Sequence, residues 1–217
     1  MKNIIVFILI SFLSANSFAQ YKEVQPHQDK NESGGGFQKD HLFTGGGIQL
    51  SLSNYDFVIG ASPVLGYSFN KWFDAGIGFS YVHIGEKEAF DDGYGNVYFT
   101  GNKTRLNDYA PLVFTKFYPF KFMFIQAQFE ENFVTAKYIY ASGAPSDKIS
   151  YNVSSLLMGA GYCGGRESVG DMFYYISLSI DVLKNRRSPY VQTIGNSVSY
   201  LPVLRAGLQI PLFQGKR

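Results

Sequence analysis

One histidine of the sequence, His83, lies where it could act as a catalytic base. Hydrolysis or acyl transfer by such a base requires a hydroxyl nucleophile within hydrogen-bond reach. Ser80 lies three residues before His83 and Glu86 lies three residues after it. In an extended strand, residues three apart point to opposite faces, and the residue at position 85, which would share the face of His83, is a glycine. The spacing does not build a catalytic site, so we predict no catalytic residue and no enzyme.

A second set of polar side chains recurs at alternate positions of otherwise apolar segments. On a closed sheet they would share the interior face; they are Asp74, Lys116, Gln126, Gln128, Glu130, Asn132, Asp181 and Arg205. A buried charge is strongly destabilising unless it is paired. We therefore expect Lys116 and Arg205 to pair with Glu130 and Asp181 and to fill the interior. The alternative is a path for protons or small ions through the same residues.

Two charged clusters fall between the apolar segments, namely Glu86, Glu88, Asp91 and Asp92, and then Lys184, Arg186 and Arg187. The acidic spacing does not match a calcium-binding loop, so we interpret this cluster as a solvated loop. The basic cluster follows an apolar segment directly. Guanidinium groups bind phosphate readily, and the candidate ligands are the phosphates of lipopolysaccharide; ordinary surface charge is the alternative.

The sequence contains no Walker loop, HExxH motif or Cys/His cluster at metal-ligand spacing, so we expect neither a cofactor nor a metal. The single cysteine, Cys163, has no partner for an intramolecular disulfide. A net charge of +2 is too small for a nucleic-acid-binding protein. Aromatic residues and charged residues each make up 17% of the chain, yet the mean hydropathy is −0.06. Alternation of apolar and polar residues in a membrane β-barrel produces this combination.

The elements that would position these residues show a period of two. In residues 55–69, large apolar side chains such as Phe57, Ile59 and Leu65 alternate with small or polar ones, which is typical of a strand with two different faces. The small face is too weakly charged for the surface of a soluble lipocalin-like barrel. Eight segments follow this pattern: 43–54, 55–69, 72–85, 105–118, 121–137, 150–163, 172–184 and 199–213.

The connections alternate in length. Three are short, at Asn70-Lys71, at Pro119-Phe120 and at 164–170, whereas those at 85–104, 141–149 and 185–198 are longer and polar. We therefore predict an all-β fold, an eight-stranded antiparallel up-and-down transmembrane β-barrel with short periplasmic turns and longer extracellular loops.

The N-terminus has the layout of a secretory signal peptide. Lys2 precedes the apolar run 4–13, and small residues stand before a predicted cleavage after Ala19. We expect a signal peptide over 1–19, a flexible periplasmic linker over 20–41, the barrel over 42–213 and a tail over 214–217.

Over roughly 42–213 the sequence resembles the small outer-membrane β-barrel domain family of Gram-negative bacteria, with an OmpA/OmpX-like architecture. The resemblance rests on glycine-rich alternation in the early strands and on the segments 125–130, 181–183, 188–190 and 205–210. Phe213 precedes a four-residue tail, whereas the family pattern ends on an aromatic residue. The resemblance implies an outer-membrane location and a barrel, and none of these motifs is catalytic.

Together these features predict a non-enzymatic outer-membrane protein with a structural or surface-interaction role. Its expected partners are outer-membrane lipid and lipopolysaccharide, and an extracellular partner bound through the loops 85–104 and 185–198; we expect no nucleic acid and a monomer. Some small outer-membrane barrels modify lipid A, so a deacylase or acyltransferase centred on His83 is the first alternative. A narrow ion-conducting pore is the second.

Overall fold

The computed structural model describes residues 37–52, 56–91, 97–194 and 197–213. The expected signal peptide, most of the linker and the tail at 214–217 lie outside the described residues. Residues 39–41, at the end of the expected linker, form a short 3-10 turn, η2 (Lys39–His41).

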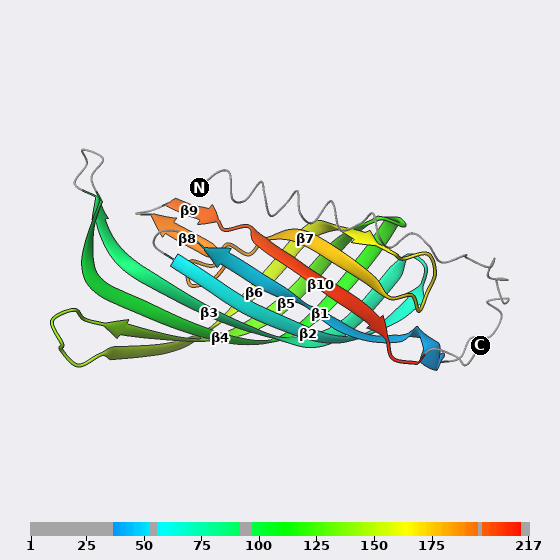
Figure 1. Ribbon diagram of the computed structural model, residues 1–217, viewed down its shortest axis with the longest axis horizontal. Coiled ribbons are helices and arrows are strands. Elements are labelled where there is room, and N and C mark those ends of the chain that lie inside the picture. Colours follow the sequence, from blue (N-terminus) through cyan, green and yellow to red (C-terminus); the bar gives the residue numbers. More distant parts are fainter. Residues whose placement is uncertain (1–36, 53–55, 92–96, 195–196, 214–217) are drawn as a thin grey trace, which may run out of the picture. The chain divides into compact units, whose positions relative to one another are not determined.

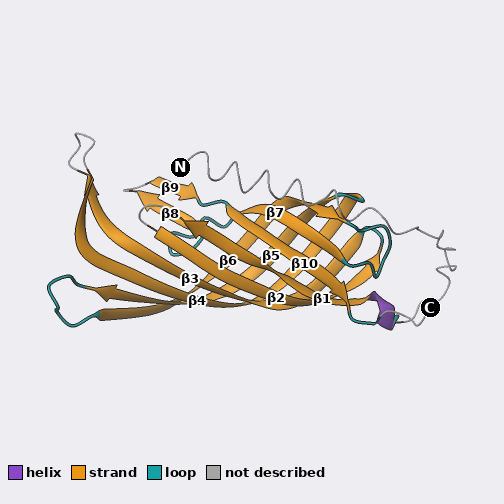
Figure 2. Ribbon diagram, viewed as in Figure 1, coloured by secondary structure: helices purple, strands orange, loops and turns teal. Residues whose placement is uncertain are grey.

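Eight antiparallel strands close into a ring in the order β1-β10-β7-β6-β5-β4-β3-β2 (Figures 1 and 2). Each strand pairs with its sequence neighbour in the ring, and β1 pairs with β10 to close it. The predicted eight-stranded barrel is confirmed. The ring strands are β1 (Leu42–Leu52), β2 (Asp56–Asn70), β3 (Phe73–Asp91), β4 (Val97–Phe120), β5 (Met123–Ile139), β6 (Asp147–Gly164), β7 (Phe173–Asp181) and β10 (Val203–Pro211).

The prediction that residues 85–104 and 185–198 form long loops is wrong, because both segments contain strands. Residues 85–104 are mostly strand, because β3 and β4 continue beyond the ring as a hairpin whose register runs to Asp91 and Val97. Residues 185–198 contain β8 (Val191–Ile194), which pairs with β9 (Ser197–Tyr200) in a separate hairpin. In Figure 1 the β3–β4 hairpin and the β5–β6 hairpin both extend past the ring at the same end.

The last two expected strands are also shorter than predicted. The segment 199–213 is interrupted at Leu201-Pro202, where proline has no N–H to donate to a ladder. β7 ends at Asp181 instead of residue 184, and the carboxylate of Asp181 accepts a hydrogen bond from the backbone N–H of Leu183. This bond to a residue two positions on is an Asx turn, and it carries the chain out of the sheet.

The two faces of the ring differ sharply, as β5 illustrates. Phe124, Gln126 and Glu130 are buried inside, whereas Ile125 and Phe129 on the alternate positions are about half exposed, at 50% and 42%. A soluble lipocalin-like barrel has the opposite distribution, so that alternative is wrong. The apolar exterior and polar interior are those of a membrane-spanning barrel. No helix among the described residues is both long and apolar enough to cross a membrane.

The interior is filled by alternating small and large side chains. Phe43, Leu112 and Phe114 form one buried cluster, and a Cβ placed on Gly66 would lie 2.2 Å from the Phe43 ring. The glycine on β2 therefore makes room for the aromatic ring of β1. The free Cys163 is buried in a second cluster with Tyr118, Phe124 and Phe173. These side chains leave little open space within the barrel.

We predict that Ile77→Arg destabilises the barrel in lipid. Ile77 is 60% exposed on the outer face of β3, between the outward-facing Leu65 of β2 and Val113 of β4. An arginine on a lipid-facing site near the bilayer midplane costs about 2–4 kcal/mol. Urea unfolding in phospholipid vesicles measures this loss, and Ile77→Leu is the neutral control. Equal unfolding free energies of the two variants would show that this face does not contact lipid.

Candidate functional site

All eight residues predicted for the interior are buried there, each at most 8% exposed. They come from five strands: Asp74 from β3, Lys116 from β4, Gln126, Gln128, Glu130 and Asn132 from β5, Asp181 from β7, and Arg205 from β10. The period-two pattern thus places these polar side chains on one face. Their partners are only partly the expected ones.

Glu130 accepts hydrogen bonds from three side chains. Arg205 Nη2 lies 3.0 Å from Glu130 Oε1, and the Tyr190 hydroxyl donates to Oε2 at 2.6 Å. Gln128 Nε2 also donates to Oε1. The expected pair of Arg205 with Glu130 therefore forms, and a tyrosine from the chain between β7 and β8 joins it.

The expected ion pair of Asp181 is wrong. Its carboxylate accepts the Ser188 hydroxyl at 2.6 Å and the backbone N–H groups of Leu156 and Leu183, each at 3.1 Å. Asp181 stands at the end of β7, where unpaired backbone donors are available. Three such donors stabilise a carboxylate without a cation.

The expected ion pair of Lys116 is also wrong. Its Nζ lies 4.2 Å from the centroid of the Tyr175 ring, 5.2 Å from that of Phe124 and 5.6 Å from that of Phe114. These are cation–π contacts. Its cross-strand neighbour is Asp74, but that carboxylate is held by another cation.

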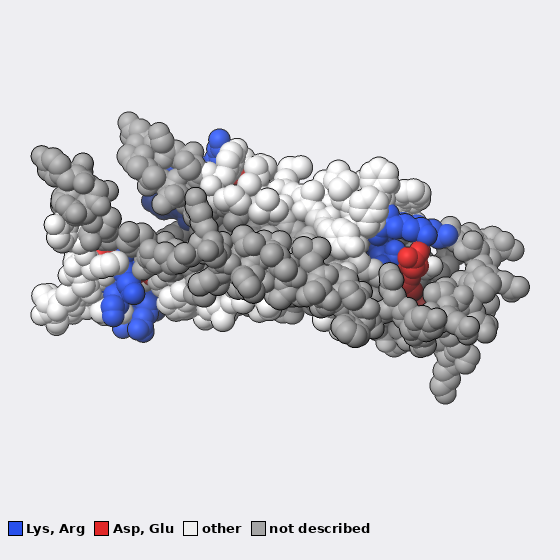
Figure 3. All heavy atoms as spheres, turned by 45° about the horizontal axis from the view of Figure 1, so that its top comes forward, with Lys and Arg blue, Asp and Glu red and all other residues white. Residues whose placement is uncertain are grey.

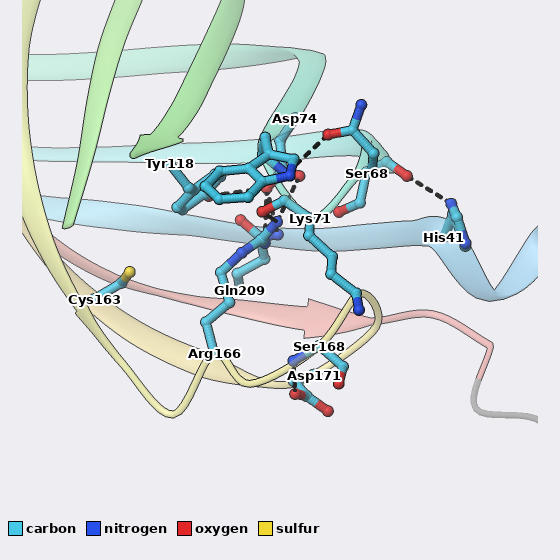
Figure 4. Close-up of polar contacts among 12 residues, drawn as sticks. His41, Ser68, Lys71, Asp74, Tyr118, Cys163, Arg166, Ser168, Asp171 and Gln209 are labelled. Atoms are coloured by element: carbon cyan, nitrogen blue, oxygen red, sulfur yellow. Dashed lines mark hydrogen bonds and ion pairs between the residues drawn. The ribbon is translucent and has the colours of Figure 1, made fainter. Parts of the chain in front are cut away.

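That cation is Arg166, which the sequence reasoning did not identify. Its Nη1 and Nη2 lie 3.1 and 3.2 Å from the two oxygens of Asp74, and its guanidinium stacks on the Tyr118 ring at 3.8 Å. The Tyr118 hydroxyl and Gln209 Nε2 also donate to Asp74. Figure 4 shows these side chains converging on Asp74. The predicted interior held three acids and two bases, and this charge deficit was the available signal for a further cation.

The turn that carries Arg166 and the segment after β7 both fold into the barrel. Arg166 closes the end with the short turns, and Ser188 and Tyr190 enter from the opposite end. Between them lies a cavity of about 20 Å³, bordered among others by Lys116, Gln128 and Arg205. This volume holds about one water molecule. The arrangement does not favour the predicted alternative of an ion-conducting pore.

His83 lies on the outer face of β3, away from the interior network. Its Nδ1 is 2.8 Å from Asn107 Oδ1, and its ring centroid is 5.5 Å from that of Phe57. Tyr81 donates to the same amide oxygen at 3.0 Å. His83 contacts an amide and an aromatic ring. These contacts do not form a catalytic set of serine, histidine and acid.

The acidic cluster does not converge. Glu88 accepts hydrogen bonds from Thr100 at 2.6 Å and Asn102 at 2.7 Å in the protruding hairpin, and these bonds hold the pKa of its carboxyl below the usual value. Asp92 lies outside the described residues. Within the described ranges, no group of three or more His, Cys, Asp or Glu is placed to hold a metal ion.

The predicted basic cluster lies on the surface, after the end of β7. Lys184 has a left-handed backbone conformation, with φ 51°, and its Nζ lies 4.1 Å from the Tyr200 ring centroid. Arg186 and Arg187 are exposed after the end of β7. The three residues therefore remain on the surface at the end of the barrel where the hairpins protrude.

A larger basic group emerges from the strand register. Arg105 of β4 pairs with Lys137 of β5, which in turn pairs with Lys148 of β6. One step further out, Lys87 of β3 pairs with Lys103 of β4. All five are exposed and continue the outward-facing positions of their strands. We call these residues (Lys87, Lys103, Arg105, Lys137 and Lys148) the basic row. In the view of Figure 3, blue side chains lie at both ends of the barrel, this end included.

The nearby acids lie on the other face of the same hairpins. Glu86 follows the inward positions of β3, and Glu88 bonds to inward positions of β4. Asp147 follows the inward positions of β6 and accepts the Tyr140 hydroxyl at 2.7 Å. In these hairpins the five bases of the row therefore occupy outward positions, whereas Glu86 and Asp147 occupy inward ones and Glu88 bonds to inward ones.

No protein-family model and no curated protein matches the chain. Among the solved structures that are similar are two of Ail, the attachment invasion locus protein of Yersinia pestis, one of them in complex with the heparin analogue sucrose octasulfate. Their sequence identities are 11% and 13% and their TM-scores 0.41 and 0.38; each match covers 78% of this chain and 96% or 95% of the other. The fold assignment itself rests on the closed ring of strands. The chain has the architecture of a small outer-membrane β-barrel protein.

We predict that Arg166→Met destabilises the barrel by about 3–5 kcal/mol, because it leaves the buried Asp74 carboxylate without its cation. Lys121→Gln is the matched control. It breaks the exposed ion pair with Glu167 near the same end, and such a pair contributes about 0–1 kcal/mol. Urea unfolding in lipid vesicles measures both losses. Similar small losses in the two variants would show that Arg166 does not neutralise Asp74.

Proposed function

We propose that this protein is a non-enzymatic outer-membrane barrel that binds phosphorylated lipid headgroups, those of lipopolysaccharide, at its outward-facing surface. The observation that carries the proposal is the basic row. Three of its members, Arg105, Lys137 and Lys148, stand directly opposite one another on three adjacent strands.

The position of the basic row supports a lipid partner. On β4 the exposed residues Tyr109 and Val113 follow Arg105 in the sequence and share its outward face. Tyr109 packs against Tyr81 with ring centroids 5.0 Å apart, and paired aromatic rings are typical of a membrane interface. Arg105 lies four residues from Tyr109 in the direction of the protruding hairpin, about 13 Å along the strand. Phosphate groups of the headgroup layer occupy this level outside the hydrocarbon.

The charge pattern also supports an anionic ligand. Like charges directly opposite one another destabilise a sheet, and the row places two such pairs around Lys137. Asp147 follows the opposite face, and Glu88 is bonded to Thr100 and Asn102. Phosphate between these side chains would relieve the repulsion, and an arginine fork or a lysine near an anionic surface contributes about 1 kcal/mol.

The orientation of the barrel follows from the same proposal. β1 starts at Leu42, at the end that holds the short turns, and the basic row lies at the other end. With the predicted signal peptide, this puts the short turns in the periplasm and the hairpins outside. Lys184, Arg186 and Arg187 would then face the same leaflet as a second, weaker contact. The closed ring leaves no strand edge to pair with a second copy, so we propose a monomer.

We predict that Arg105→Gln, Lys137→Gln and Lys148→Gln combined weaken lipopolysaccharide binding at least tenfold, and that raising the salt concentration weakens the wild-type protein in the same direction. Fluorescent lipopolysaccharide titrated into the detergent-solubilised protein measures the affinity, with dephosphorylated lipopolysaccharide as the ligand control.

The matched variant neutralises Lys39, Lys71 and Lys121, which are exposed at the other end of the barrel, and should bind like wild type. A third variant, Lys184→Gln with Arg186→Gln and Arg187→Gln, measures the contribution of the second contact. Wild-type affinity in the Arg105, Lys137, Lys148 variant would overturn the proposal.

A further inference from the structure

Asp108 is a buried carboxylate that the interior network does not use. It is 1% exposed on the inward face of β4, and neither of its oxygens has a hydrogen-bond partner among the described residues. Each of the other three buried carboxylates has at least three donors: Asp74, Glu130 and Asp181. Asp108 therefore stands apart from them.

The surroundings of Asp108 are apolar along its own row of the sheet. Its cross-strand neighbours are Val82 on β3 and Val134 on β5, both 1% exposed. The charged groups that act on it most strongly are Glu130 and Arg205. Arg205 donates to Glu130 and Tyr190 from Nη2, and no hydrogen bond joins it to Asp108 among the described residues, where its Nε has no partner. A bare carboxylate in such surroundings is costly.

A second unpaired acceptor lies beside it. Asn132 follows the same inward face of β5, two residues from Val134, and is fully buried. Its amide nitrogen donates to the Val153 carbonyl and the Ser155 hydroxyl, both at 2.9 Å on β6. Asn132 Oδ1 itself has no partner among the described residues. Diagonal neighbours on paired strands are about 7–8 Å apart, close enough for Asp108 and Asn132 oxygens to share one small cation.

The charges of the interior show which cation fits. The buried acids among the described residues are Asp74, Asp108, Glu130 and Asp181, and the buried bases are Lys116, Arg166 and Arg205. One negative charge is left over, and a monovalent cation balances it where a divalent ion would leave an excess. Carboxylate and amide oxygens are ligands for hard ions. We propose that Asp108 and Asn132 form an interior binding site for a monovalent cation such as sodium or potassium.

This site is separate from lipid binding at the basic row, so either proposal can fail alone. The test is carried out on the purified full barrel in detergent. Thermal unfolding is measured in sodium, potassium or tetramethylammonium chloride at equal ionic strength. We expect sodium or potassium to raise the unfolding midpoint in a saturable way that tetramethylammonium, too large for the interior, does not reproduce. Crystals soaked in rubidium or thallium salts should show an anomalous peak within ligand distance of Asp108.

Asp108→Asn keeps the shape and removes the charge, and should abolish both the cation effect and the peak. Glu167→Gln, an exposed change of the same charge near the short turns, should keep both. Should Asp108→Asn fail to fold, the wild-type comparison and the anomalous map still decide. Equal midpoints in all three salts with no anomalous peak at Asp108 would overturn the proposal, as would a midpoint that depends on pH but not on the cation, since Asp108 would then carry a proton.

Discussion

Closure of the sheet between β1 and β10 is the constraint on which the rest of this structure depends. A hydrocarbon environment offers no hydrogen-bond partner to a strand edge, so each of the eight strands must be paired on both sides. The closing pair is tight: a Cβ on Gly207 would lie 2.1 Å from the carbonyl oxygen of Gly46. Side chains larger than glycine at this position would push the two strands apart and open the ring.

Closure with eight strands leaves an interior just wide enough for side chains. The narrow interior determines how its charged side chains are stabilised. Charged groups in the interior have little water to solvate them, so they depend on protein partners. The residues of the eight strands alone do not supply enough hydrogen-bond donors and cations for these buried carboxylates. The turn after β6 contributes Arg166 to Asp74, and the segment after β7 contributes Ser188 to Asp181 and Tyr190 to Glu130. The same residues reach into the barrel from its two ends, so the groups that neutralise the interior charges also help to fill the lumen.

Beyond the ring the strands no longer enclose a narrow interior, so charged side chains can be exposed to water. The β3–β4 and β5–β6 hairpins continue the alternation of the barrel into water, so their outward face follows the lipid-facing positions and their inward face follows the lumen positions. The basic row occupies the former, and Glu86 and Asp147 occupy the latter. The outward positions of the strands are therefore apolar along the barrel and basic in the hairpins. The basic row lies directly beyond the lipid-facing residues, at the level that we propose for the headgroup layer.

The sequence by itself determined the strands, the two faces and the interior position of residues such as Asp74, Lys116 and Glu130, because alternation along one strand is a local property. It did not determine that β3 and β4 extend past the ring, since charged residues such as Lys87 and Lys103 suit either a loop or a solvated strand. Only the tertiary structure decided that Arg166, and not Lys116, pairs with Asp74, and that no donor in the described part of the chain reaches Asp108. Those contacts depend on the stagger of the strands and on turns that fold back into the lumen, which join residues 92 positions apart, and no periodicity within a single strand records them.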